Sequence, residues 1–251
     1  MFSNRYIFIY SAVMVIIVAT VLSAASVVLK PFQEKNRKIE KMSGILTSAK
    51  ISSEKADIPD NYKQYIVQEL LVNVDGDIVS NYENNKLQKG DVRAFDIALK
   101  VQLDKLKKLK SGDKDVDPVF PIYVCSKDGE KIFIVPLLGK GLWGPIWGNI
   151  ALKDDFNTVI GVTFDHKSET PGLGAEISTR EFQKQFDGKK IFDENNLFTS
   201  IKVVKGGVNN SKINPQHGVD AISGGTITSV SVSDMLEDVL SVYEPFVKKH
   251  I

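Results

Sequence analysis

The chain has 251 residues, of which 43% are hydrophobic and 25% charged, and its formal net charge is +1. This length can bury the core of one large domain or two small ones, and the composition is that of a globular protein. The near-neutral charge gives no indication of a nucleic-acid partner, and we predict none. The single cysteine, Cys125, excludes an intramolecular disulfide, and the three scattered histidines are too few for a histidine-rich metal site.

The N-terminal region departs from this globular pattern. No charged residue occurs between Tyr6 and Leu29, and about 20 consecutive apolar residues suffice for a helix to cross a membrane. The alternative is a cleaved signal peptide with its cleavage site at Ala24–Ser26, but the apolar run continues past that site. We therefore predict a retained transmembrane anchor at residues 6–29, after a short tail of residues 1–5.

The charges that flank the anchor leave its orientation open. Arg5 precedes the segment, whereas a cluster of basic residues follows it: Lys30, Lys35, Arg37, Lys38 and Lys41. The positive-inside rule alone would keep the C-terminal part in the cytoplasm, yet long domains can be translocated regardless of such charges. The sequence alone therefore does not decide on which side of the membrane the domain lies.

Between the anchor and Pro118 the chain is polar. Residues 30–50 are predicted to form a helical stalk, and residues 51–118 a polar region of helical and mixed structure. Within that region, leucines at helical spacing predict a helix over residues 94–109. Its lysines are interpreted as a solvated face, with a role at a membrane surface as the less favoured alternative.

Past Pro118 the sequence predicts strands and then helices. The expected strands form two successive hairpins with polar loops, 122–125 with 131–138 and 149–153 with 158–165. The remaining expected elements are a helix at 174–186, a strand at 201–204 and an amphipathic helix at 227–248, which Pro245 kinks or ends early. This order is typical of an α+β domain. We expect an antiparallel sheet with flanking helices over residues 119–251, preceded by a single transmembrane helix.

Three segments of this part carry residues suited to holding a ligand. The first is Asp220 to Ser229, which includes Ser223-Gly224-Gly225-Thr226-Ile227-Thr228 at the start of the final helix. Glycines let a backbone approach a ligand closely, and the N–H groups of a first helical turn bind anions such as phosphate. Ordinary capping by Ser or Thr explains the same residues without a ligand, so spacing alone leaves both interpretations open.

The second segment is Glu169-Thr170-Pro171-Gly172-Leu173-Gly174. Its Pro-Gly turn can present backbone N–H and C=O groups to a flat polar ligand. His166 and Glu169 are three residues apart, as in some helical metal sites, but Pro171 argues against a continuous helix, and we predict no metal site. The third segment is Gly139 to Gly148, which contains both tryptophans of the chain. They belong either to the core or to a wall for an aromatic ring.

Together the three segments resemble one protein family, the C subunit of the sodium-translocating NADH:quinone oxidoreductase, and the related G subunit of the Rnf electron-transport complex. Both families contain the motif Asp-x-x-Ser/Thr-Gly-Ala-Thr-x-Ser/Thr, in which a flavin transferase joins FMN through its phosphate to the threonine. Residues 220–228 match this motif, with Gly225 in place of the usual Ala. Residues 169–174 match without a change, and Gly141-Leu142-Trp143 resembles the oxidoreductase family more than the Rnf family.

The resemblance implies a membrane-anchored subunit that carries FMN covalently on Thr226 and relays electrons from NADH toward quinone, coupled to sodium export. It implies further cofactor contacts from Ser223, Gly224, Gly225, Thr228, Glu169, Thr170, Gly172, Leu173, Gly174, Leu142, Trp143 and Lys205. It implies no catalytic residue, because Thr226 is first the substrate of the flavin transferase and afterwards a tether.

The partners implied in the same way are the other subunits of the membrane complex and the flavin transferase. The implied location is the bacterial inner membrane, with the C-terminal domain on the periplasmic side. An Rnf-type subunit with the same tether and a membrane-tethered binding module without a flavin are the alternatives.

Overall fold

The computed structural model of the protein describes residues 3–251, which fall into two compact units divided between Met42 and Ser43. The predicted tail at residues 1–5 lies partly outside the described residues. Helix α1 (Asn4–Ser48) begins in the first unit and contains the predicted anchor and all but the last two residues of the predicted stalk. Its apolar part has a mean hydropathy of 2.7, and it is the one helix in the described range that is long and apolar enough to cross a membrane.

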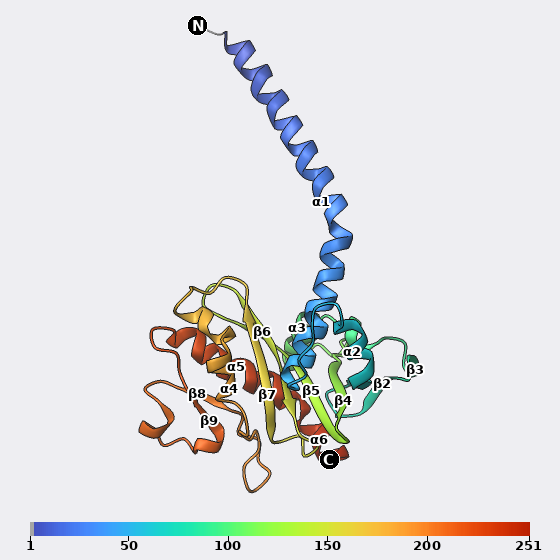
Figure 1. Ribbon diagram of the computed structural model, residues 1–251, viewed down its shortest axis with the longest axis vertical. Helices are drawn as coiled ribbons and strands as arrows, with labels where there is room; N and C mark the ends of the chain where they lie inside the picture. Colours follow the sequence, from blue (N-terminus) through green and yellow to red (C-terminus); the bar gives the residue numbers. More distant parts are fainter. Residues whose placement is uncertain (1–2) are drawn as a thin grey trace. The chain divides into compact units, whose positions relative to one another are not determined.

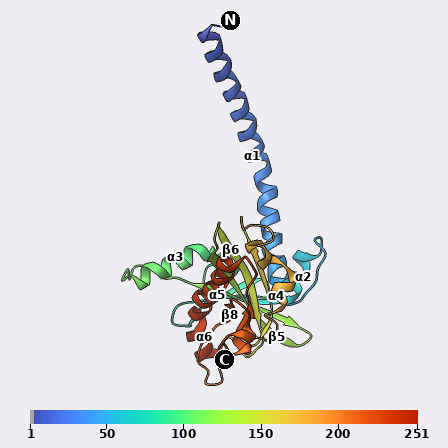
Figure 2. The same cartoon turned by 90° about the vertical axis from the view of Figure 1, so that its left-hand side faces the viewer.

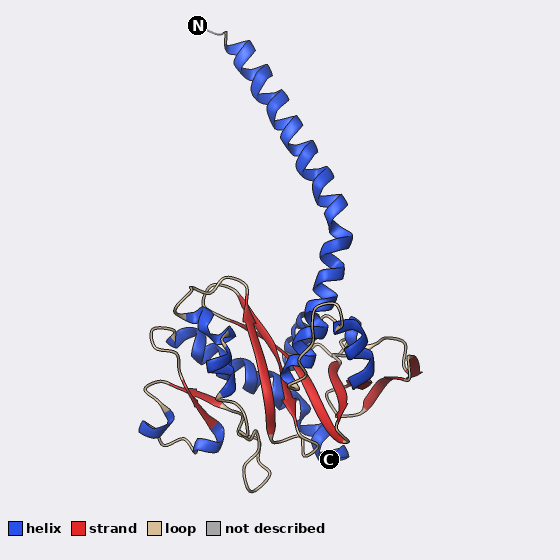
Figure 3. Ribbon diagram, in the orientation of Figure 1, coloured by secondary structure: helices blue, strands red, loops and turns tan. Residues whose placement is uncertain are grey.

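The second unit is built on a seven-stranded antiparallel sheet, which confirms the predicted fold class (Figure 1, Figure 3). The strands are β1 (Ile66–Val72), β2 (Ile78–Glu83), β3 (Lys86–Lys89), β4 (Phe120–Lys127), β5 (Glu130–Lys140), β6 (Pro145–Leu152) and β7 (Val159–His166). Their order in the sheet is β3-β2-β1-β4-β5-β6-β7. The two predicted hairpins are β4–β5 and β6–β7, and both are confirmed.

The three strands before β4 were not predicted from the sequence. β1 pairs with β4, so residues 51–118 and residues 119–251 share one sheet. β3 is exposed along its whole length, and two of its four residues are lysines. Lysine on an edge strand discourages pairing with another chain, but it also hides the apolar alternation by which strands are identified.

The helices of this unit are shorter than predicted. The helix expected at 94–109 is a 3-10 turn, η1 (Ala94–Asp96), followed by α3 (Leu99–Lys110), which extends away from the sheet in Figure 2. The helix expected at 174–186 is η2 (Gly174–Ser178) followed by α4 (Arg180–Lys184). Thr179 separates these two elements, because its extended backbone ends η2 while its hydroxyl accepts a hydrogen bond from Phe182 N and caps α4.

The final helix is also divided, as Pro245 indicated. It consists of α5 (Thr226–Leu240), η5 (Ser241–Tyr243) and α6 (Glu244–His250), with Pro245 in the first turn of α6, where proline is tolerated. A short helix α2 (Ile58–Tyr65) precedes β1. The strand predicted at 201–204 is β8 (Lys202–Val204), and it pairs in parallel with β9 (Gly218–Asp220), which was not predicted.

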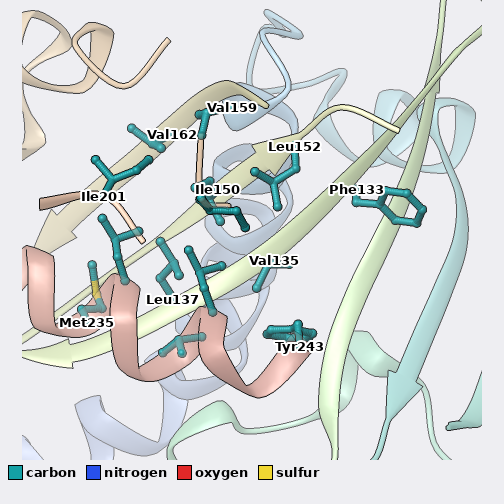
Figure 4. Close-up of a cluster of buried hydrophobic side chains, with 14 of the residues drawn as sticks. Phe133, Val135, Leu137, Ile150, Leu152, Val159, Val162, Ile201, Met235 and Tyr243 are labelled. Atoms are coloured by element: carbon teal, nitrogen blue, oxygen red, sulfur yellow. The ribbon is translucent and has the colours of Figure 1, made fainter. Parts of the chain in front are cut away.

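The core lies between the sheet and α5. Val135, Leu137 and Ile150 face Met235 and other buried residues of α5 (Figure 4). A Cβ atom on Gly139 of β5 would lie 2.7 Å from Met235 Cβ, so the absent side chain lets the helix approach the strand closely. At the other end, the Tyr243 hydroxyl donates to the Pro121 carbonyl at 2.9 Å. These contacts hold α5 against the sheet and thereby place its N-terminus, which begins at Thr226.

Candidate functional site

One buried carboxylate joins the three segments singled out from the sequence. Glu169 is 4% exposed and lies just after β7. Its Oε1 accepts a hydrogen bond from the backbone N–H of Trp143 at 2.8 Å, and its Oε2 accepts one from Thr228 Oγ1 at 2.6 Å. The loop between β5 and β6, the turn after β7 and the first turn of α5 are therefore held together at Glu169.

Two glycines make room for this carboxylate. A Cβ atom on Gly141 would lie 2.5 Å from Glu169 Oε1. A Cβ atom on Gly174 would lie 2.4 Å from Thr228 Oγ1 and 2.6 Å from Glu169 Oε2. Real Cβ atoms do not approach other atoms so closely, so a larger residue at either position would displace the carboxylate or its partner. The glycines of the second and third segments thus serve the contact between segments.

The turn before α5 presents Thr226 at the first residue of the helix, half-buried. The preceding N-cap residue is Gly225, which has no side chain to bond the N–H groups of the first turn. A hydrogen bond holds the turn against α5, because Ile222 N donates to the buried Ser229 Oγ at 3.1 Å. The first-turn N–H groups and the positive end of the helix dipole are therefore available to an anion beside the Thr226 hydroxyl.

The glycine pair of this turn packs against Leu173. Gly224 has a φ of 73°, in the left-handed region that favours glycine. Gly225 has a φ of −99°, which any residue can adopt, but a Cβ atom there would lie 3.0 Å from the Leu173 carbonyl carbon and oxygen. An alanine at position 225, as in the usual motif, would thus require Leu173 to move by a few tenths of an ångström. Gly225 is buried in this contact, so the turn is closely packed.

Large apolar side chains stand exposed on the two segments that meet this turn, the loop between β5 and β6 and the turn after β7. Leu142 is 46% exposed, Trp143 64% and Leu173 41%. The backbone of Trp143 is held at both ends, since its N–H donates to Glu169 and its carbonyl accepts from Ser168 Oγ at 3.0 Å. Trp143 therefore does not belong to the core. Exposed apolar surface beside fixed polar groups is typical of a ligand-binding site.

The turn after β7 is ordered by its own hydrogen bonds. Leu173 N and Ala175 N both donate to the Thr170 carbonyl at 3.1 Å. Gly172, with a φ of 75°, donates its N–H to Glu176 Oε1 at 2.9 Å. Thr170 and Gly172 are exposed, so their remaining polar groups face solvent on the same turn that carries Leu173.

Lys205 lies apart from these contacts. It is exposed and directly follows β8, whose last residue, Val204, pairs with Asp220 of the motif. No hydrogen bond or ion pair joins Lys205 to residues 223–228 within the described range, so its proposed contact with the cofactor stays a prediction.

Sequence reasoning assigned no role to two residues that shape the first segment. Asp220 Oδ1 accepts from Val208 N at 2.7 Å and holds the loop after β8 next to the motif. Ser229 is fully buried and fixes Ile222. Both residues lie within the ten-residue segment that the sequence singled out, so their place in the motif was the only available signal.

The comparisons with known proteins concern this same region. Residues 141–241, which include all the contacts around Glu169, match the FMN-binding domain family. Over 223 residues, the chain is 35% identical to the C subunit of the Na(+)-translocating NADH-quinone reductase from Vibrio vulnificus, covering 86% of this chain and 83% of that protein. The chain belongs to this C-subunit family.

Further members of the C-subunit family agree with this assignment. The one from Neisseria meningitidis is 33% identical over 221 residues, with 86% of this chain and 82% of that protein covered. The crystal structure of the one from Parabacteroides distasonis has a TM-score of 0.72 at 36% identity, covering 87% of this chain and 96% of that one. The crystal structure of NqrC from Shewanella oneidensis, at 24% identity and a TM-score of 0.65, shows the same fold.

Membership in the C-subunit family confirms the resemblance carried by the three segments and selects it over the Rnf-type and flavin-free alternatives. The protein is a member of that family with an FMN-binding domain, and its relatives are subunits of an oxidoreductase complex.

Proposed function

We propose that this protein carries FMN in a phosphoester bond to Thr226 and relays electrons through it as a membrane-anchored part of the NADH-quinone reductase. The observation that carries the proposal is the position of Thr226 at the uncapped start of α5. Glu169 joins this first turn, through Thr228, to Trp143, and the turn before the helix packs against Leu173. When bound, FMN supplies the capacity to accept and release single electrons.

The residues present fit such a group. The phosphate in a diester with the Thr226 hydroxyl carries one negative charge, which the N–H groups of the first turn of α5 and its dipole stabilise. Trp143, Leu142 and Leu173 offer exposed apolar surface against which a flat ring can lie. Thr170 and Gly172 present polar groups at the edge of that surface. Lys205 is assigned to charge neutralisation near the phosphate or the ring.

No residue of the site is required to act as an acid, base or nucleophile in the finished protein. The flavin transferase uses the Thr226 hydroxyl as its substrate, and Thr226 afterwards serves as a tether. What the chain contributes is therefore positioning: Glu169 fixes the three segments, and the apolar side chains shield one side of the ring from water.

The tether can be tested with flavin fluorescence in a denaturing gel, using the full chain produced with a flavin transferase and exported. The wild-type band should fluoresce, and Thr226→Leu should abolish the signal. Ser231→Leu is the matched control, because it places a leucine five residues further along α5 and should leave the band fluorescent. Fluorescence retained by Thr226→Leu through denaturation would sink the tether assignment.

We further propose that α1 anchors the protein in the inner membrane, that the domain lies on the periplasmic side, and that other subunits of the complex pack around the anchor. The length and hydropathy of α1 support the anchor, whereas the charges that flank it do not support the periplasmic location of the domain. A protease added outside sealed cells whose outer membrane has been removed should digest the domain. Protection from the protease would instead favour the cytoplasmic orientation.

A further inference from the structure

The second unit contains a cavity of about 580 Å³ that shares no lining residue with the Thr226 site. The end of α1 and the loop after it form one wall, and β7, η2 and α4 form the others. Its volume lies within the range of about 300–1,000 Å³ that is usual for small-molecule sites.

The charged side chains around this cavity do not balance. Three cations, Lys50, Arg180 and Lys184, face a single carboxylate, Asp187. Lys50 Nζ lies 2.5 Å from Asp187 Oδ2, so this pair compensates itself. Across residues 3–251, neither Arg180 nor Lys184 has an ion-pair partner. The cavity wall therefore keeps two uncompensated positive charges.

Two of these cations also repel each other. Arg180 and Lys184 are exposed like charges four residues apart on α4, and such a pair costs stability. An anion that binds between two like charges relieves their repulsion. Lys50 differs from them, because it follows the end of α1 with a φ of 57° and caps that helix, with Ile51 N donating to the Leu46 carbonyl at 3.0 Å.

We propose that this cavity binds a phosphate monoester. At neutral pH such a group carries a charge close to −2, which matches the two uncompensated cations. The planar guanidinium of Arg180 suits paired hydrogen bonds to phosphate oxygens, and Lys184 adds a second positive charge. The cavity is many times larger than a phosphate ion, and Ile51 and Val162 supply apolar surface for the organic part.

The test is calorimetric titration of the full chain in detergent with three probes: inorganic phosphate, adenosine monophosphate and short-chain phosphatidic acid. One of the two esters should bind saturably and more tightly than inorganic phosphate, and the comparison of the esters distinguishes a soluble ligand from a lipid headgroup. Arg180→Ala with Lys184→Ala should weaken that binding by about tenfold or more for each cation removed.

A matched control removes two lysines from α3, which does not line the cavity. Lys107→Ala with Lys110→Ala makes the same change in net charge and should leave the affinity unchanged. Thr226→Leu should also leave it unchanged, which separates this site from the proposed flavin tether. The proposal is overturned if no probe binds saturably, if both double variants lose affinity equally, or if inorganic phosphate binds as tightly as the better-binding ester.

Discussion

Replacing Glu169 with alanine tests whether one carboxylate holds the flavin site together. The substitution removes the acceptor of two hydrogen bonds, from Trp143 N at 2.8 Å and from Thr228 Oγ1 at 2.6 Å. Hydrogen bonds to a charged group contribute about 1.5–3 kcal/mol each, so the free energy of unfolding should fall by roughly 3–6 kcal/mol. The Thr228 hydroxyl is 2% exposed and would be left without its acceptor, which places the cost toward the upper end.

The assay is thermal unfolding of the full chain, followed by circular dichroism. For a unit of this size, each 1 kcal/mol lowers Tm by about 2–4 °C, so Glu169→Ala should lower it by roughly 10 °C or more. Glu169→Gln keeps one accepting oxygen, so its Tm should lie between those of the wild type and Glu169→Ala. Glu176→Ala is the control, because its carboxylate accepts a single exposed hydrogen bond, from Gly172 N, whose loss costs about 1 kcal/mol.

A double-mutant cycle with Thr228→Val sharpens this prediction. Each single substitution leaves the other partner buried without its hydrogen bond, so the two effects should not add, and a coupling of about 1 kcal/mol or more is expected. If Glu169→Ala lowers Tm no further than Glu176→Ala, or if the cycle shows additive effects, Glu169 does not join these segments in the way described.

Three further predictions concern the rest of the domain. Cys125 is fully buried and burial raises its pKa to about 11, so it should react with a thiol reagent at neutral pH only after unfolding; equal rates before and after would contradict its burial. Burial alone would raise the pKa of Asp155, but hydrogen bonds from Thr158 and Asn157 N–H hold that pKa below its usual range. The stabilisation by the Asp155 carboxylate is therefore present above the unfolded pKa of about 3.9 and is lost as the pH falls through the folded pKa. In urea unfolding, Asp155→Asn should be less stable than the wild type at neutral pH, and this difference in stability should disappear in acid. A difference that persists in acid would be inconsistent with this reasoning. A Cβ atom at Gly148 would lie 1.8 Å from the Thr163 carbonyl oxygen on β7, so Gly148→Ala should lower stability by about 1–3 kcal/mol or more, and an unchanged Tm would argue against the β6–β7 register.

The parts of the fold that the sequence predicted are those with local signals. The β4–β5 and β6–β7 hairpins combine apolar runs with polar loops, and α5 carries an apolar stripe at helical spacing. Pro245 correctly indicated a break in that helix, because proline lacks a backbone N–H and is tolerated in the first turn of a new helix, here α6.

β1 was missed because it contains a buried carboxylate whose partners all lie outside the strand. Glu69 in this strand is 2% exposed, an unusual place for a carboxylate. It is compensated by an ion pair with Arg93 at 2.5 Å and by hydrogen bonds from the Tyr62 hydroxyl and Phe95 N. None of these partners lies in the strand, so the sequence shows Gln68 and Glu69 interrupting an apolar run without any local sign that Glu69 is compensated.

In the candidate site, too, the sequence predicted the local segments but not the contacts between them. The motif around Thr226 and the turn at residues 169–174 were found as separate segments, and the family resemblance assigned all of them to one cofactor. What the sequence could not show is that Glu169 bonds Trp143 and Thr228, which lie 26 and 59 residues away from it. Glu169 was predicted to contact the cofactor, and that contact stays a prediction; its two oxygens also accept hydrogen bonds within the protein.

The central claim is the covalent bond between FMN and Thr226, and the most direct measurement is mass spectrometry of the full chain after production with a flavin transferase. The intact mass should exceed that of the bare chain by one FMN less one water, and fragmentation of the peptide that contains residues 220–229 should place the added mass on Thr226. An unmodified chain, or an added mass on any other residue, would contradict the account.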